Sequence, residues 1–538
     1  MSDERNESGQ PAEAPRQARR LARAAGLVSF GTLLSRLLGL VRDQLFAALF
    51  GATVVSDAFV IAFRIPNLLR DLFAEGALSA AFVPTFTATL RNRSRREAFL
   101  LANRLTTTLC AILGALVLLG LFGADAIVSG IAPGFADTPG KQELAVHLTR
   151  IMLPFLPLVS LAAVAMGMLN SLDHFFVPAF APACFNIVSI VVGAALWLKG
   201  LDPRIAVAGW AVGTLLGGAA QFLVQVPALR REGWRFRPSL DLAFRDAGMR
   251  RMALLMGPAT VGLAATQVNI VVNSMFASHV AGGAAWLNYA FRLMQLPLGL
   301  FGVAVGTIAT AALAKRAAAR DMAGMSQTLG QSLRLVSFLT IPATVGLIVL
   351  AAPIIRLIYQ RGNFTAADTE ATAGALVWYA VGLFAYSAVK VVAPAFYALG
   401  RARVPLVASV SAVAANVVFN ALCFERFGHR GLAFGTSLAA LVNFAVLTIA
   451  FRRSCGPVGG AVWGGTLKCL AAAAPMGLGA WGAARAIEAT LGTASLAVRA
   501  VGALVPVAVG IGIYGAACWA LRLPELSDML SLLRRRKA

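Results

Sequence analysis

Apolar runs long enough to cross a bilayer, about 20 residues each, follow one another along nearly the whole 538-residue chain. No polar stretch of the size of a soluble domain separates them. In hydrocarbon every backbone N–H and C=O group must be bonded within the protein, so only α-helices and closed β-barrels span membranes. Barrel strands are short and alternate in polarity, whereas these runs are long and uniformly apolar. The pattern predicts an all-α polytopic membrane protein.

We predict about fourteen transmembrane helices, at residues 27–50, 54–90, 99–123, 144–170, 176–198, 205–229, 252–276, 286–314, 335–351, 370–398, 406–424, 431–451, 462–487 and 497–521. With a cytosolic N-terminus, the inward segments carry 30 Lys and Arg residues and the outward loops carry 7. This asymmetry agrees with the positive-inside rule and places both termini in the cytosol. The same rule accounts for the formal charge of +23 without a nucleic-acid partner.

The two halves of the chain share a local repeat. Residues 62–73 and 290–301 have six identities at one constant offset of 228, and Arg64 matches Arg292. An offset of six helices with the same orientation indicates two parallel six-helix lobes; chance similarity of two apolar helices is the alternative. The predicted organisation is a disordered cytosolic tail (1–25), an N-terminal lobe (26–229), a basic cytosolic linker (230–251), a C-terminal lobe (252–451), two added helices (452–521) and a basic cytosolic tail (522–538).

Ionisable residues interrupt the apolar sequence between Ser35 and Glu75. They are Arg36, Arg42, Asp43, Asp57, Arg64, Arg70, Asp71 and Glu75. Such groups are costly at membrane depth unless they face water or a partner, so they usually mark a substrate or ion path. Together with Arg292 the arginines outnumber the acids, and a guanidinium grips phosphate or carboxylate oxygens in bidentate geometry. We therefore predict a positively charged cavity for an anionic ligand. Interhelical salt bridges or snorkelling side chains are the alternative, to which Arg64, Arg70 and Asp71 are suited.

Other kinds of site have little support in the sequence. The six cysteines have no CxxC spacing, the four histidines are scattered near loops, and neither a GxxxxGK[ST] loop nor an HExxH helix occurs. We expect no metal, no cofactor and no enzymatic activity. Transport is then expected to be coupled to the membrane potential or an ion gradient, and the coupling ion cannot be read from these residues.

Six segments carry a family resemblance. They are SRLLGLVRD (35–43), SDAFVIAFRIPNLLRDLFAEGALSAAFVPTF (56–86), NYAFRLMQLPLGLFGVAVGT (288–307), YQRGNFTAADT (359–369), AVKVVAPAFYALG (388–400) and GLAFGTSLAALVN (431–443). They closely resemble the lipid II flippase MurJ (MviN) family of the multidrug/oligosaccharidyl-lipid/polysaccharide exporter superfamily. The resemblance implies a fourteen-helix protein of the bacterial inner membrane. It also implies translocation of lipid II, the undecaprenyl-pyrophosphate-linked peptidoglycan precursor, from the cytosolic to the outer leaflet.

The resemblance also implies roles for particular residues. The predicted substrate-cavity residues are Ser35, Arg36, Arg42, Asp43, Asp57 and Arg292, and the predicted gate or salt-bridge residues are Arg64, Arg70, Glu75 and Lys390. Asp57 matches a position with both cavity and gate interactions. The helices of 452–521 are implied to form a hydrophobic groove for the polyprenyl tail. One departure is Phe291, where the family often has Asp, so Arg292 lacks an adjacent acid.

Three rival functions remain open at this stage. An exporter of another polyprenyl-linked saccharide or of drugs would favour fewer arginines in the cavity. A membrane enzyme acting on polyprenyl phosphates would need clustered acids or a catalytic histidine at membrane depth, and neither is visible. A non-transporting scaffold for cell-wall synthesis enzymes would need none of the cavity arginines.

Overall fold

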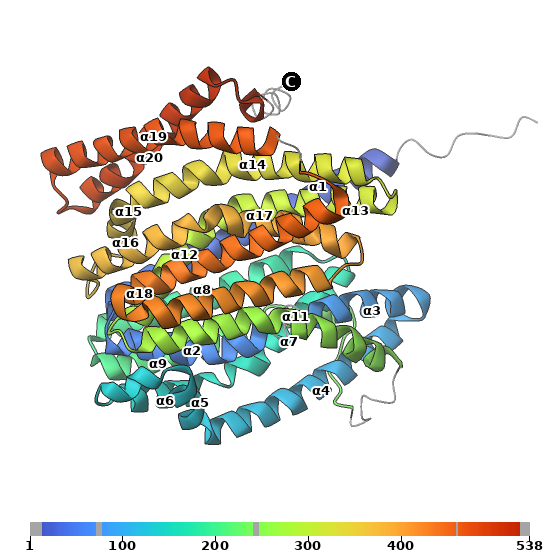
Figure 1. Cartoon of the computed structure of the whole chain (residues 1–538). Helices are drawn as coiled ribbons and strands as arrows, with labels where there is room; N and C mark the ends of the chain where they lie inside the picture. Colours follow the sequence, from blue (N-terminus) through green and yellow to red (C-terminus); the bar gives the residue numbers. More distant parts are fainter. Residues whose placement is uncertain (1–12, 72–77, 240–246, 459–460, 528–538) are drawn as a thin grey trace, which may run out of the picture. The chain divides into compact units, whose positions relative to one another are not determined.

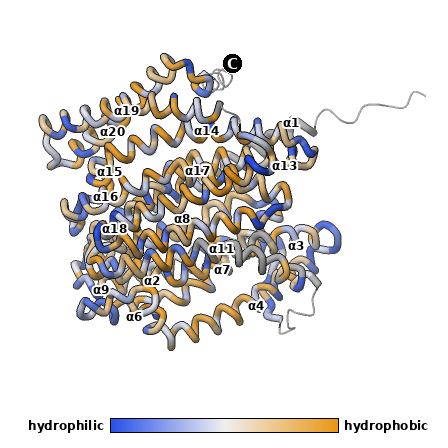
Figure 2. Tube along the Cα trace, viewed as in Figure 1, coloured by the Kyte–Doolittle hydropathy of each residue, from blue (hydrophilic) through white to orange (hydrophobic). Residues whose placement is uncertain are grey.

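The computed structural model describes the chain except for residues 1–12, 72–77, 240–246, 459–460 and 528–538. All regular structure in the described residues is helical, which confirms the predicted all-α fold. Within them, nine helical segments are long and apolar enough to cross a membrane; the count of fourteen stays a prediction. Figure 2 shows hydrophobic residues along the middle of helices such as α4 (Arg95–Phe122), with hydrophilic residues gathered toward helix ends.

The chain divides into two compact units. Unit 1 comprises residues up to 46, 62–127 and 143–263. It contains most of α1 (Glu13–Phe50), the later part of α2 (Val54–Arg70), α3 (Ser79–Asn92), α4, most of α6 (Lys141–Met152), α7 (Phe155–Ser171), α8 (Phe176–Lys199), α9 (Pro203–Leu223), α10 (Val226–Arg231) and the start of α11 (Ala247–Ser278). The short α5 (Ala124–Ile131) passes from unit 1 into unit 2. Buried rings of Phe82, Phe86 and Phe99 join α3 to α4 in the core of unit 1.

Unit 2 comprises residues 47–61, 128–142 and 264–538. Its further elements are a 3-10 turn (Pro133–Asp137), α12 (Gly283–Pro297), a π-helical turn (Leu298–Gly302), α13 (Val303–Ala318), α14 (Met322–Val349), α15 (Ala351–Ile358), α16 (Ala366–Val381), α17 (Leu383–Ala398), α18 (Arg403–Cys455), α19 (Ala461–Leu491) and α20 (Leu496–Ala520). Figure 1 shows α19 and α20 side by side in red, and buried side chains such as Phe338, Met476 and Tyr514 pack both helices against α14.

The helix bounds repeat along the chain. α1 ends at Phe50 and α11 ends at Ser278, 228 positions later, and α7 begins 228 positions before α17. α2 ends at Arg70, 228 positions before Leu298, where the π-helical turn between α12 and α13 begins. α18 corresponds to α8 plus α9, because Gly428, with φ of 52°, interrupts it between the predicted spans 406–424 and 431–451. The repeat inferred from 62–73 and 290–301 therefore extends through all the helices before α19.

Several boundaries differ from those expected. α1 already begins at Glu13, inside the stretch predicted to be a disordered tail, because its Ala- and Arg-rich sequence favours helix. The span predicted at 54–90 contains α2 and α3, and residues 72–77 between them lie outside the described part of the chain. In the predicted basic tail, Glu525 accepts a 2.6 Å hydrogen bond from Arg334 of α14, so the start of this segment is anchored.

Candidate functional site

The last turns of α1, in unit 1, present two of the predicted cavity arginines in different environments. Arg36 is exposed and has no ion pair with any described residue. Arg42 is only 12% exposed; its Nη2 lies 2.8 Å from Oδ1 of Asp43, and its guanidinium carbon lies 5.2 Å from the ring centroid of Phe185. The carbonyl of Ser35 accepts a 2.9 Å hydrogen bond from the side chain of Asn186, which joins α1 to α8. Arg42 is thus oriented by its neighbours, whereas Arg36 keeps its donors available.

Two of the predicted gate or salt-bridge residues lie further along unit 1, on α2. Nη2 of Arg70 is 2.9 Å from Oδ1 of the adjacent Asp71, and Nε of Arg70 lies 3.1 Å from the same oxygen. Arg64 is half-buried on the same helix. Glu75 lies outside the described residues. Arg70 therefore takes part in a local ion pair.

Arg292 and Lys390 belong to unit 2, on α12 and α17. Arg292 is half-buried, while Lys390 is exposed and makes no ion pair with the described part of the chain. Phe291, where the resemblance implies an acid, packs edge-on against Tyr379 of α16, with ring centroids 5.4 Å apart. An aromatic contact between two helices thus occupies the position where the resemblance implied a charge.

We expect Phe291→Leu to lower the free energy of unfolding by about 1 kcal/mol, because it removes the aromatic pair and keeps most of the apolar volume. Thermal unfolding in detergent measures this change. Transport should persist, since no charge is altered. Unchanged stability combined with lost transport would contradict a packing role for Phe291.

Asp57 forms a fully buried ion pair in unit 2. Its Oδ2 lies 2.8 Å from Nζ of Lys141, and the two side chains are 0% and 2% exposed. The backbone N–H groups of Gly282 and Ala285, at the start of α12, donate to the same carboxylate at 2.9 and 3.0 Å. Nζ of Lys141 also lies 4.3 Å from the ring centroid of Phe135. Asp57, predicted to line the substrate cavity, has its carboxylate held here by protein donors that join three distant segments.

Lys141 is a functional candidate that the sequence analysis missed. It counted there only as one of the charges of the outward loops. Its partner is 84 positions away, so neither helical periodicity nor a local motif connects the two residues. Lys141 also begins a helix with several other polar residues, KQELAVHLTRIM, so its sequence context gave no signal of burial.

Further contacts within unit 2 hold the end of α1. Asn363 donates from its backbone N–H to the carbonyl of Ala48 at 2.9 Å and from its side chain to the carbonyl of Leu49 at 2.6 Å. The hydroxyl of Tyr289 donates to the carbonyl of Gly51 at 3.3 Å. Gly51 itself has a φ of +59°, and a Cβ there would lie 2.3 Å from the carbonyl oxygen of Asn363. The end of α1 is therefore closely packed on the loop before α16.

We expect Gly51→Ala to destabilise the protein by about 2 kcal/mol or more, since alanine is strained in the left-handed region and its Cβ has no space. Gly200→Ala is the matched control, because Gly200 also has a positive φ, of 56°, but open space around it. Thermal unfolding of both variants separates backbone strain from the contact with Asn363. Equal destabilisation would show that the contact contributes nothing.

The start of α12 also contacts Asp368 of α16 and His429 of α18. Nε1 of Trp286 donates to Asp368 at 3.0 Å, and the Trp286 ring lies 5.0 Å from the ring of His429. Burial lowers the pKa of His429, which follows the break of α18 at Gly428, so this ring is uncharged at neutral pH. It therefore adds no positive charge beside α12.

Unit 2 contains a further polar cluster, between α11 and α18. Nδ2 of Asn420 lies 2.7 Å from Oδ1 of Asn273 and 2.5 Å from Oδ1 of Asn416, and Asn273 donates to Thr436 at 3.1 Å. These amides carry no charge. Across the residues that the structure describes, no group of three or more His, Cys, Asp or Glu side chains could hold a metal ion.

Solved structures define the class of this fold. A multidrug resistance MATE family transporter of the MOP superfamily, in an inward-facing conformation, matches with a TM-score of 0.66 and covers 81% of this chain and 98% of its own at 16% identity. At that identity the likeness shows the fold alone. This chain therefore has a fold similar to that of this transporter.

Sequence matches of higher identity show the family to which the chain belongs. The family model described as Lipid II flippase MurJ matches residues 46–502. The probable lipid II flippase MurJ of Vibrio cholerae is 36% identical over 438 residues, which cover 80% of this chain and 82% of that protein. The lipid II flippase MurJ of Burkholderia cenocepacia is 36% identical over 439 residues, with 80% and 84% covered. A MurJ structure in an inward closed conformation has a TM-score of 0.75 and 27% identity and covers 92% of this chain and 98% of its own. The chain belongs to the lipid II flippase MurJ family, and it is a membrane transporter, not an enzyme.

Proposed function

We propose that this protein moves lipid II from the cytosolic to the outer leaflet of the bacterial inner membrane. The main observation that supports this proposal is the family match across residues 46–502. The arginines at 36, 42 and 292 agree with it, because each lies on a helix within otherwise apolar sequence.

The proposed cavity supplies a polar path for the pyrophosphate, which cannot cross hydrocarbon while hydrated. Arg36, exposed and without an ion pair among the described residues, offers all its donors to a phosphate. Arg42, already oriented by Asp43 and Phe185, loses less side-chain entropy on binding. The polyprenyl tail stays in lipid, and exposed leucines on α19 and α20, such as Leu478 and Leu504, support a groove there.

We assign the Asp57–Lys141 pair to closure of the outward end during alternating access. Burying both charges removes their hydration, and that cost offsets much of their mutual attraction. Opening this end would rehydrate both groups, so the closed and open states can be close in free energy. Such a balance suits a gate that must open once in every transport cycle.

Transport carries out no bond chemistry, so the proposed energy source is the membrane potential or an ion gradient. Moving one charge across 100 mV changes its free energy by about 2.3 kcal/mol. The cell-wall synthesis enzymes that use the substrate on the outer face are the proposed protein partners.

A leaflet-translocation assay in reconstituted vesicles tests the function. Labelled lipid II should move between leaflets, and faster when a potential is imposed. An unrelated polyprenyl-linked saccharide should move slowly, which separates a flippase for this substrate from a broader exporter. Failure of lipid II to move under any condition would favour the scaffold alternative.

A further inference from the structure

A polar pocket of about 460 Å³ lies within unit 2, between α15, α16 and the last turns of α19. It is separate from every predicted site residue. Arg499, at the start of α20, donates to the carbonyl oxygens of Gln360 and Thr493 and so joins the two loops that border the pocket. The volume falls in the range of small-molecule sites, about 300–1,000 Å³.

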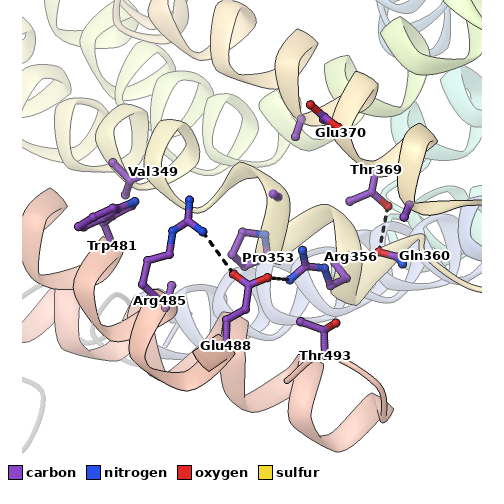
Figure 3. A pocket seen from close by; sticks show the side chains of 14 residues that line it. Val349, Pro353, Arg356, Gln360, Thr369, Glu370, Trp481, Arg485, Glu488 and Thr493 are labelled. Atoms are coloured by element: carbon purple, nitrogen blue, oxygen red, sulfur yellow. Dashed lines mark hydrogen bonds and ion pairs between the residues drawn. The ribbon is translucent and has the colours of Figure 1, made fainter. Parts of the chain in front are cut away.

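Both signs of charge line this pocket, as Figure 3 shows. Arg356 is paired with Glu488 at 3.0 Å and is only 22% exposed. Arg485 is 67% exposed and approaches Glu488 only to 3.9 Å, so most of its donors are free to bind a ligand. Glu370, on α16, is exposed and has no ion pair within the described ranges. The pocket thus offers one available cation and one available anion.

The pocket opens where apolar and polar parts of the surface meet. Trp481 lines it and is 50% exposed, and Arg485 lies 5.8 Å from its ring centroid. On the same helix, Leu478 and Leu491 are 72% and 56% exposed. Tryptophan beside exposed leucine and arginine is typical of helix segments at the level of lipid headgroups. By the predicted orientation, these are headgroups of the outer leaflet.

We propose that this pocket binds the headgroup of an aminophospholipid, the phosphate on Arg485 and the ammonium on Glu370. A zwitterion fits better than an anion, because each available charge gains an opposite partner and Glu370 would repel a purely anionic headgroup. The glycerol and acyl chains would extend past Trp481 over the exposed leucines of α19. This lipid site is independent of the cavity for lipid II.

Native mass spectrometry of the delipidated full-length protein tests the site with three added lipids: phosphatidylethanolamine, phosphatidylglycerol and phosphatidylcholine. We expect phosphatidylethanolamine to be retained about two- to fivefold more than phosphatidylglycerol, as one exposed ion pair allows. Glu370→Gln should bring the two lipids to equal retention, and Glu370→Lys should invert the preference. Arg485→Gln should weaken retention of both.

Arg426→Gln is the matched control, since Arg426 is an exposed arginine that does not line the pocket. Thermal unfolding should be unchanged for all four variants, which rules out misfolding as the cause. Equal retention of all three lipids by the unaltered protein would overturn the proposal. So would Glu370→Gln and Arg485→Gln variants that behave like Arg426→Gln, or a pocket that retains only added lipid II.

Discussion

Lys141→Met should lower the free energy of unfolding by about 3–5 kcal/mol, the cost of leaving one partner of a buried ion pair without its counter-charge. The loss is large here because Asp57 is 0% exposed and, among the described residues, keeps only the N–H groups of Gly282 and Ala285 as donors. Thermal unfolding in detergent measures it. Growth supported by this variant in a flippase-depleted strain should fail as well, since the segments that the pair joins would separate.

The double variant Asp57→Asn with Lys141→Met shows whether stability is lost because the ion pair is gone or because one charge stays buried without a partner. It removes both charges, so it should recover much of the stability that Lys141→Met loses. Lys199→Met is the matched control, because Lys199 is exposed at the end of α8. A Lys141→Met variant as stable as this control would show that the ion pair does not form.

The features of the fold that were predictable are those that local sequence encodes. The first predicted span ends at residue 50, where α1 ends, because hydrophobicity stops there at a glycine turn. The repeat was predictable because residues 62–73 and 290–301 still share several identities at one constant offset. The start of α1 at Glu13 was not predicted, because the polar composition of the first 25 residues is typical of a disordered tail.

The candidate site was predictable in its residue types but not in its contacts. Arginines and acids in apolar sequence can be found by inspection, yet the choice between ligand binding and ion pairing depends on tertiary packing. Arg42 and Asp43 are adjacent in sequence, so their pair could have been expected. The Asp57–Lys141 pair joins positions 84 residues apart, and the Phe291–Tyr379 contact joins two helices, so both required the folded chain.

Replacing Arg36, Arg42 or Arg292 singly by Ala should reduce translocation at least about 30-fold, because each would leave a buried phosphate with one charged partner fewer. Each variant should fail to support growth of a flippase-depleted strain at normal expression. Arg426→Ala is the matched control, since that arginine is exposed on α18 just before its break at Gly428. Full growth with all three alanine variants would refute the cavity role, and a scaffold would tolerate all three.

Lysine replacements should distinguish the two arginines of α1. Arg36 has no ion pair among the described residues, so Arg36→Lys keeps the charge that the proposal requires and should retain part of the activity. Arg42 contacts Asp43 through both Nε, at 3.2 Å, and Nη2, at 2.8 Å, while its plane lies near Phe185. A lysine cannot contact Asp43 through two nitrogens or stack on Phe185. Arg42→Lys should therefore lose nearly as much translocation activity as Arg42→Ala. Equal activity of the two lysine variants in the translocation assay would mean that only the charge of Arg42 matters and that its orientation by Asp43 and Phe185 does not.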